Sequence, residues 1–149
     1  MKNSRRMHRP VKALIVLMAI LLCLVLASCV GNGPSIEKLK TYRDLSWEGT
    51  ELTVKLGTNK DTGCEWKNEF GDDSIIDYSI NRKFTLSDNG AMKGQTVGIL
   101  SAGFEGKSEG VTTITFSTSC DWDGNEPGYT YIVTVEVAAD GTIISASGE

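Results

Sequence analysis

The feature that most constrains the fold is a two-residue alternation of polar and apolar side chains, which recurs in short segments along the chain. Residues 129–137, for example, place Tyr131, Val133 and Val135 on one side of an extended backbone. Period two with β-branched and aromatic side chains is typical of strands that have one buried face. We therefore expect β-strands in the segments with this pattern, which are residues 51–56, 74–84, 111–117 and 129–137.

Turn-forming residues separate these segments. The clusters rich in Gly, Asp, Asn, Ser, Thr or Pro are residues 58–63, 71–73, 87–90, 106–110 and 123–128. Residues 35–42 would suit a short helix or, equally, the first strand, and no long segment has a helical period. Short strands between turn signals favour an all-β fold, and specifically an antiparallel β-sandwich.

The N-terminus has the layout of a secretory signal. Residues 1–12 carry five basic side chains and no acidic one, and about fourteen apolar residues follow, from Ala13 to Leu26. A basic region before a short apolar run is typical of a signal that export removes. The run is shorter than the roughly 20 residues that a membrane-spanning helix needs. We therefore expect residues 1–28 to form a signal helix that is cleaved off.

The residues that follow the apolar run resemble a lipobox. Leu26-Ala27-Ser28-Cys29 is similar to the motif of bacterial lipoproteins, in which the cysteine is diacylated and becomes the first residue. Two acyl chains hold a protein stably on a membrane, whereas one holds it weakly. The resemblance implies a lipidated Cys29 on the outer face of the cell membrane, a tether over residues 29–35 and a folded domain over residues 36–149. The alternative is an ordinary signal in which Cys29 is incidental.

The mature chain is strongly acidic. Loss of the five basic residues of the signal leaves ten Lys and Arg against nineteen Asp and Glu, a net charge of −9. A chain with this charge should not bind nucleic acid or anionic lipid headgroups electrostatically.

The sequence also offers little for catalysis. The single histidine, His8, lies in the signal and is lost with it. The mature chain therefore lacks the base for Ser–His or Cys–His catalysis and the usual nitrogen ligand of a catalytic zinc. The remaining acidic residues are scattered, which is typical of a solvated surface. We expect no enzymatic activity, no cofactor and no metal site.

Residues 121–125 place oxygen-bearing side chains at alternate positions, as a calcium loop does. An EF-hand loop needs glycine at its sixth position and glutamate at its twelfth. Here the glycine, Gly124, is fourth and the twelfth residue is Ile132. We interpret this segment as a polar loop between two strands.

Three further segments together resemble a known family. Residues 59–66 read Asn-Lys-Asp-Thr-Gly-Cys-Glu-Trp, similar to the Asn-Pro-Thr-Thr-Gly-aromatic-x-Trp segment of chagasin-type inhibitors of papain-family cysteine proteases. Residues 98–103 begin and end in glycine and precede a strand, where that family has a Gly-rich loop. Cys120-Asp121-Trp122 follows a strand, where the family has Arg-Pro-Trp. The order and approximate spacing agree over roughly residues 48 to 138.

The resemblance implies an immunoglobulin-like sandwich with three loops side by side at one end, which wedge into the protease cleft. Trp66 matches the family as a core residue. The candidate inhibitory-loop residues are Asn59, Asp61, Thr62, Gly63, Gly98 and Trp122. Gly98 matches only loosely, and Asp61 replaces the first threonine of the family segment.

These candidate residues also have plainer interpretations. Tryptophan is a frequent binding anchor, but Trp122 would equally suit burial under its own loop. Asn59, Thr62 and Gly63 would serve in a turn without any contact to a partner. The sequence also departs from the family: Lys60 replaces the proline, and Cys120 and Asp121 replace Arg and Pro.

The resemblance places the first and third loops next to each other, which has a consequence for the cysteines. Cys23 leaves with the signal and Cys29 is acylated, so Cys64 and Cys120 remain as an even pair in an oxidising compartment. Cys64 and Cys120 both replace residues that lie in neighbouring loops of the family. The resemblance therefore implies a disulfide that ties the two loops. Such a bridge would preorganise the loops for binding or act for stability alone.

These patterns favour one function and leave one alternative. We expect an exported, membrane-tethered inhibitor of papain-like cysteine proteases that blocks the active-site cleft. The alternative is a surface module for binding or adhesion that has the same sandwich and no inhibitory activity.

Overall fold

Eight strands and one short α-helix make up the residues that the computed structural model describes, 35–87 and 96–149. Residues 1–34 lie outside the described residues, and so do the predicted signal helix, Cys29 and most of the tether. Within the described ranges, no helix has the length and apolar character required to cross a membrane. The elements are α2 (Ile36–Lys40), β1 (Arg43–Glu48), β2 (Glu51–Asn59), the 3₁₀ turn η2 (Lys60–Thr62), β3 (Lys67–Phe70), β4 (Ile76–Leu86), β5 (Val97–Gly106), β6 (Gly110–Ser117), β7 (Thr130–Val137) and β8 (Ile143–Gly148).

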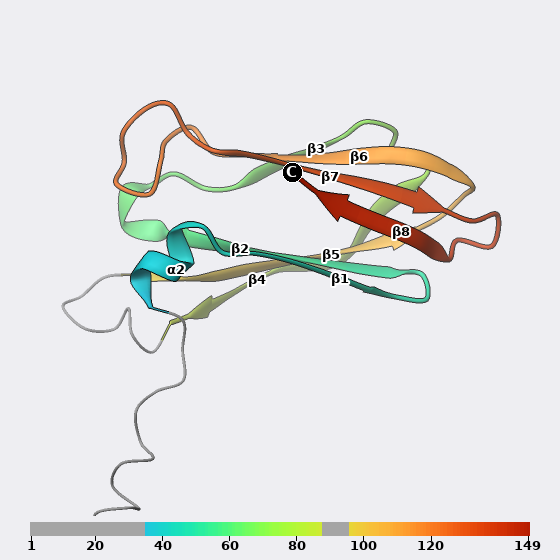
Figure 1. The fold of residues 1–149 in the computed structure, drawn as a ribbon, viewed down its shortest axis with the longest axis horizontal. Coiled ribbons are helices and arrows are strands. Elements are labelled where there is room, and N and C mark those ends of the chain that lie inside the picture. Colours follow the sequence, from blue (N-terminus) through green and yellow to red (C-terminus); the bar gives the residue numbers. More distant parts are fainter. Residues whose placement is uncertain (1–34, 88–95) are drawn as a thin grey trace, which may run out of the picture. The chain divides into compact units, whose positions relative to one another are not determined.

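The strands form two four-stranded antiparallel sheets that face each other (Figure 1). One sheet has the order β1-β2-β5-β4 and the other has the order β3-β6-β7-β8. When the first seven strands are lettered A to G, these orders become A-B-E-D and C-F-G, which is the arrangement of constant-type immunoglobulin domains. β8 extends the second sheet by one edge strand. The predicted immunoglobulin-like antiparallel sandwich is confirmed.

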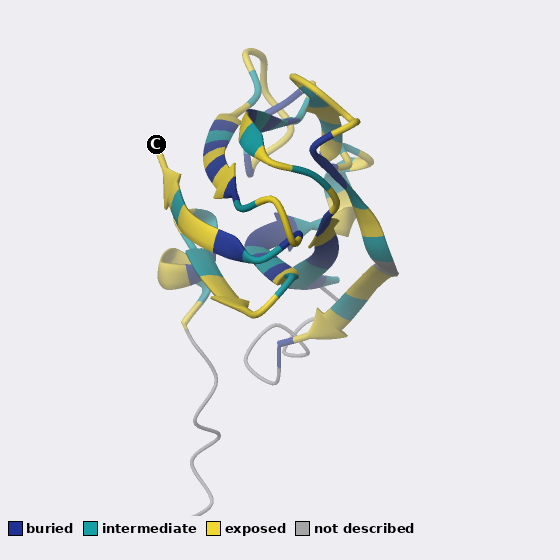
Figure 2. Ribbon diagram, turned by 90° about the vertical axis from the view of Figure 1, so that its right-hand side faces the viewer, coloured by how far each residue is buried: buried dark blue, intermediate teal, exposed yellow. Residues whose placement is uncertain are grey.

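The core lies between the two sheets and follows the predicted alternation (Figure 2). In β7, Tyr131, Val133 and Val135 are buried, while the residues between them are exposed or half-buried. The rings of Phe104 and Phe116 meet edge to face at 5.9 Å and join the two sheets. Burial of a large apolar side chain stabilises the fold by about 1.5–3 kcal/mol, so this layer is the main source of stability.

The two-residue alternation of the sequence did not predict four of the strands. β1, β3 and β8 are edge strands of only four to six residues, too short for the alternation to be clear. β5 is an inner strand that contains Gly98, Gly103 and Gly106, and glycine normally indicates a turn. The segment at residues 35–42, left open between helix and strand, contains the helix α2.

Two connections lie together at one end of the sandwich (Figure 1). One joins β2 to β3 and the other joins β6 to β7; residues 59–66 and 118–129 are called the loop end below. A second small core lies beneath it, in which Leu39 of α2 packs against Val97 and Trp122. The short helix therefore docks on the loop end.

Candidate functional site

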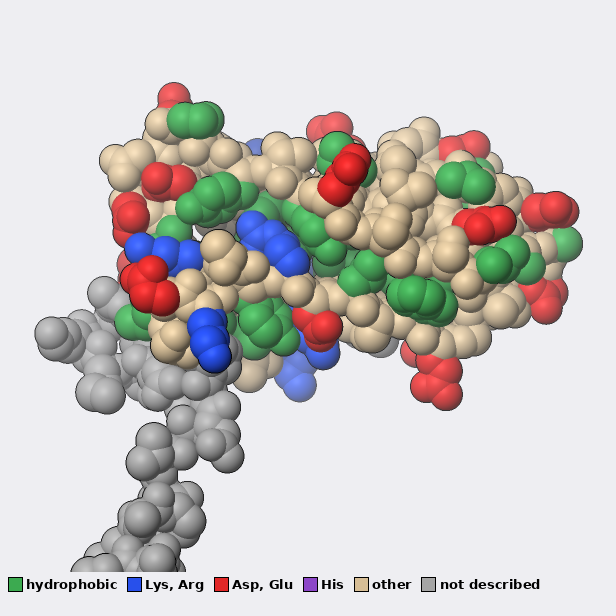
Figure 3. Space-filling model, viewed as in Figure 1, with side chains coloured by type: hydrophobic (Ala, Val, Ile, Leu, Met, Phe, Trp, Pro, Cys, Tyr) green, Lys and Arg blue, Asp and Glu red, His purple; other side chains and the backbone are tan. Residues whose placement is uncertain are grey.

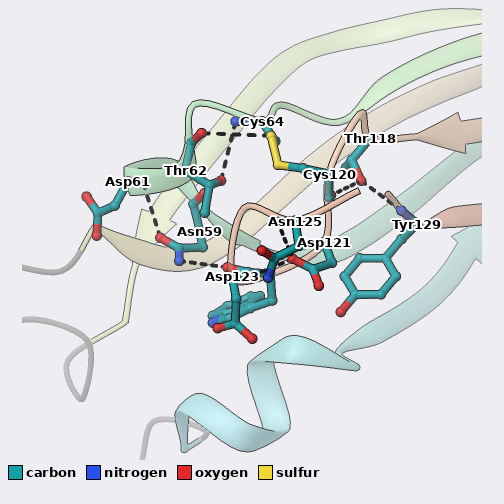
Figure 4. The surroundings of a disulfide bond; sticks show 11 residues. Asn59, Asp61, Thr62, Cys64, Thr118, Cys120, Asp121, Asp123, Asn125 and Tyr129 are labelled. Carbon is teal, nitrogen blue, oxygen red and sulfur yellow. Dashed lines mark hydrogen bonds between the residues drawn. A yellow bond between two sulfur atoms is a disulfide. The ribbon is translucent and has the colours of Figure 1, made fainter. Parts of the chain in front are cut away.

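A disulfide joins the two connections of the loop end (Figure 4). It links Cys64 to Cys120, with the Cα atoms 5.9 Å apart, which is within the range that a disulfide spans. Cys120 is buried and Cys64 is half-buried. The predicted bridge is confirmed, and with it the expectation that the first and third candidate loops are neighbours.

Asn59 holds the same two connections together with its side chain. Its amide nitrogen Nδ2 donates to the backbone carbonyl of Trp122 at 3.0 Å. Its Oδ1 accepts from the backbone N–H of Asp61 at 3.1 Å and caps the turn η2. Both functional groups of this amide are thus used inside the protein, so Asn59 positions the loops.

The first connection has an exposed tip with an ordered backbone. The Thr62 hydroxyl donates to the Asn59 carbonyl at 2.9 Å and accepts from the N–H of Cys64 at 3.3 Å. The Asp61 carboxylate accepts from the N–H of Thr96 at 2.6 Å. Gly63 has φ of 71°, a left-handed conformation that favours glycine. Local hydrogen bonds thus order this loop without the proline of the family segment.

The second connection is ordered by the Asp121 carboxylate. Oδ1 accepts from the backbone N–H groups of Asn125 at 2.8 Å and Asp123 at 2.9 Å (Figure 4). These bonds, led by that of Asn125, hold the pKa of Asp121 below its ordinary value. The carboxylate therefore stabilises its own loop, as expected of a polar loop between strands.

Trp122 is not available as an exposed anchor in this structure. Only 6% of it is exposed, and it packs against Leu39 and Val97 in the small core beneath the loop end. The structure thus shows the burial that the sequence left as the alternative to an exposed binding anchor. The physical reason is the docking of α2, whose apolar side supplies a partner that the sequence pattern did not reveal.

Gly98 lies in a strand and not in a loop. It is the second residue of β5 and pairs with Thr58 of β2 and Leu86 of β4, at the end of these strands. A Cβ atom at this position would lie 2.2 Å from the carbonyl oxygen of Thr85, so close strand packing explains the glycine. The expectation of a Gly-rich loop at residues 98–103 is wrong, because that whole stretch belongs to β5. The connection before β5 includes residues 88–95, which lie outside the described residues.

One residue near the loop end, Arg43, was not predicted from the sequence. The guanidinium of Arg43 lies 4.7 Å from the ring centre of Trp66, and burial lowers its pKa below the ordinary value. Trp66 is itself buried, and its indole N–H donates to the carbonyl of Gly57 at 3.0 Å. The expectation that Trp66 is a core residue is confirmed. Arg43 lies at the start of β1, a strand that the alternation did not reveal.

The charges around this end are mixed. On the face seen in Figure 3, Lys and Arg side chains gather in the half that carries α2, whereas Asp and Glu are spread over the whole face. Lys40 of α2 lies 3.9 Å from the carboxylate of Asp123. In the part of the chain that the structure describes, no three His, Cys, Asp or Glu side chains are grouped so as to hold a metal ion. Recognition at this end would depend on shape and on individual polar groups.

Comparisons with protein-family models, with curated proteins and with solved structures found no match. The basis for a functional proposal is therefore the geometry of the loop end together with the sequence resemblance.

Proposed function

We propose that this protein is an exported, lipid-anchored inhibitor that blocks the cleft of papain-like cysteine proteases with its loop end. The observation that carries the proposal is the joining of the two connections by the Cys64–Cys120 disulfide and the Asn59–Trp122 hydrogen bond. Both connections contain segments that resemble those of chagasin-type inhibitors. A crosslinked end loses little conformational entropy on binding, and a rigid projection blocks a cleft without any chemistry of its own.

The surface that would enter the cleft is the tip of the first connection. Lys60, Asp61 and Gly63 are exposed there, on a backbone that the Thr62 hydroxyl orders. Trp122 would support this tip from beneath. Gly98, inside β5, would take no part.

An inhibition assay with two matched variants tests this proposal. The mature domain should inhibit papain at micromolar concentration or below. Gly63→Asn should raise the inhibition constant at least tenfold, because asparagine tolerates a left-handed backbone but adds a side chain to the tip. Gly49→Asn is the control. Gly49 has φ of 60°, and a Cβ atom added to it, as to Gly63, would have open space for 4 Å around it. It lies in the turn between β1 and β2, at the opposite end of the sandwich. Equal inhibition by both variants would contradict the proposed contact surface.

A non-inhibitory binding module is the second candidate. The burial of Trp122 and the position of Gly98 in a strand favour it, since they remove two of the expected contacts. The same assay separates the candidates: a folded domain that does not inhibit papain at high micromolar concentration supports the binding module.

The anchor has its own test, with a control in the signal segment. In bacterial cells fed labelled palmitate, Cys29→Ala should abolish incorporation of the label and retention of the mature chain on membranes. Cys23→Ala, six residues earlier in the apolar run, should leave both unchanged. Labelled, membrane-retained Cys29→Ala protein would contradict lipidation at this cysteine.

A further inference from the structure

The start of the folded domain is fixed to the loop end. Leu39 of α2 is fully buried against Val97 and Trp122. After the helix, the carbonyl of Tyr42 accepts from the N–H of Gly57 at 2.9 Å. A Cβ atom on Gly57 would lie 1.7 Å from the carbonyl oxygen of Leu39, so the end of α2 rests directly on β2. The chain therefore enters the domain beside the candidate binding surface.

The opposite end carries the turns between β1 and β2 and between β7 and β8, and is called the distal end below (Figure 1). The carbonyl of Gly49 accepts from the N–H of Ile143 at 2.8 Å, which ties these turns together. β2 runs from the distal end to the loop end over nine residues, Glu51–Asn59. At about 3.4 Å per residue, the two ends are roughly 27 Å apart.

The tether before α2 is short. Six peptide steps separate Cys29 from Ser35 in the sequence. A polypeptide spans at most about 3.6 Å per residue, so the Cα atoms of these two residues are at most about 22 Å apart. Lipid on Cys29 therefore limits how far the entry point of the domain, and the loop end beside it, can move from the bilayer. The distal end can lie roughly 27 Å further from the bilayer than the loop end.

We propose that the lipid anchor holds the loop end toward the membrane, so that its partner is a protein bound to the same membrane surface. This inference rests on the lipid anchor proposed above. A small globular domain is about 30 Å across, which is more than the tether allows between the bilayer and the entry point. The bilayer therefore hinders a soluble protease from reaching the loop end. A protein bound to the same membrane holds its own surface at a similar distance from the bilayer and can reach it.

Spin labels on the complete lipidated chain in phosphatidylcholine vesicles test the orientation. One nitroxide is placed at Glu126→Cys in the loop end and another at Ala139→Cys in the distal turn; both sites are exposed. Ni²⁺ chelated to lipid headgroups should enhance relaxation at least threefold more strongly at residue 126 than at residue 139. An insertion of twenty Gly and Ser residues after Gly33 should remove this difference, since such a linker adds a mean span of about 25 Å. Equal enhancement at both sites in the native-length chain would overturn the orientation.

Papain in solution tests the choice of partner. The vesicle-bound, native-length chain should inhibit soluble papain at least tenfold more weakly than the same chain in detergent, and the twenty-residue insertion should restore inhibition. Equal inhibition in vesicles and in detergent would overturn the membrane-bound partner. If no form inhibits soluble papain, the proposed inhibitory function fails, and the spin-label result alone decides the orientation.

Discussion

The side-chain amide of Asn59 donates to the backbone carbonyl of Trp122, 63 positions further along the chain, at 3.0 Å. This contact joins the end of β2 to the connection between β6 and β7, and so links one sheet to the other. The same side chain caps η2 through Asp61. One residue thus sets both the shape of the first loop and its distance from the second.

Replacement of Asn59 should loosen this link. We expect Asn59→Ala to lower the free energy of unfolding by about 1–2 kcal/mol, because the Trp122 carbonyl and the Asp61 N–H lose their partner. Asn59→Asp keeps an acceptor for Asp61 but sets a carboxylate oxygen against the Trp122 carbonyl, so it should cost at least as much. Urea unfolding measures both values. An Asn59→Asp variant as stable as the wild type would show that the contact between the sheets contributes nothing.

Replacement of Trp122 should chiefly affect stability. We expect Trp122→Ala to lower the free energy of unfolding by about 3–5 kcal/mol, the usual cost of a large cavity in a core. Trp47→Ala is the matched control and should cost much less, because Trp47 is 42% exposed whereas Trp122 is 6% exposed. Similar losses for the two variants in urea unfolding would indicate that Trp122 is exposed in solution and open to a partner.

The disulfide should contribute substantially to stability. Its cysteines are 56 positions apart, and the chain-entropy treatment gives about 4 kcal/mol for a closed loop of this length. The double variant Cys64→Ser/Cys120→Ser should therefore unfold at much lower urea concentration than the wild type. Mass spectrometry of the unreduced wild-type domain should show both thiols blocked to alkylation and one linked peptide pair. Two alkylated cysteines would contradict the bridge.

Acid should weaken the second connection through Asp121. Its backbone hydrogen bonds, the one from Asn125 first, hold its pKa below the ordinary value. A depressed folded-state pKa means that the group stabilises the fold above its unfolded pKa of about 3.9. That contribution is lost as the pH falls through the folded-state pKa. Asp121→Asn keeps an acceptor but does not titrate, so this variant should lose less stability than the wild type between pH 6 and pH 2. Identical pH profiles in urea unfolding would rule out this role.

The sequence predicted four of the eight described strands, because burial of one strand face imposes a two-residue period. The segments that became β2, β4, β6 and β7 all show that period. It is weak in β1, β3 and β8, which are edge strands of only four to six residues. β5 was missed because its glycines indicate turns in isolation. In the sheet, Gly98 permits close approach to the carbonyl of Thr85.

For the candidate site, the sequence by itself determined which residues have turn-forming or crosslinking chemistry, among them Asn59, Gly63 and the two cysteines. It did not determine which way their side chains point. Only the tertiary structure decided that Asn59 holds the loops together and that Trp122 lies in a core with Leu39. The physical reason is that both contacts join segments more than sixty residues apart in the chain. A local pattern records the period of one strand, but the orientation of a loop side chain depends on what the rest of the fold brings beside it.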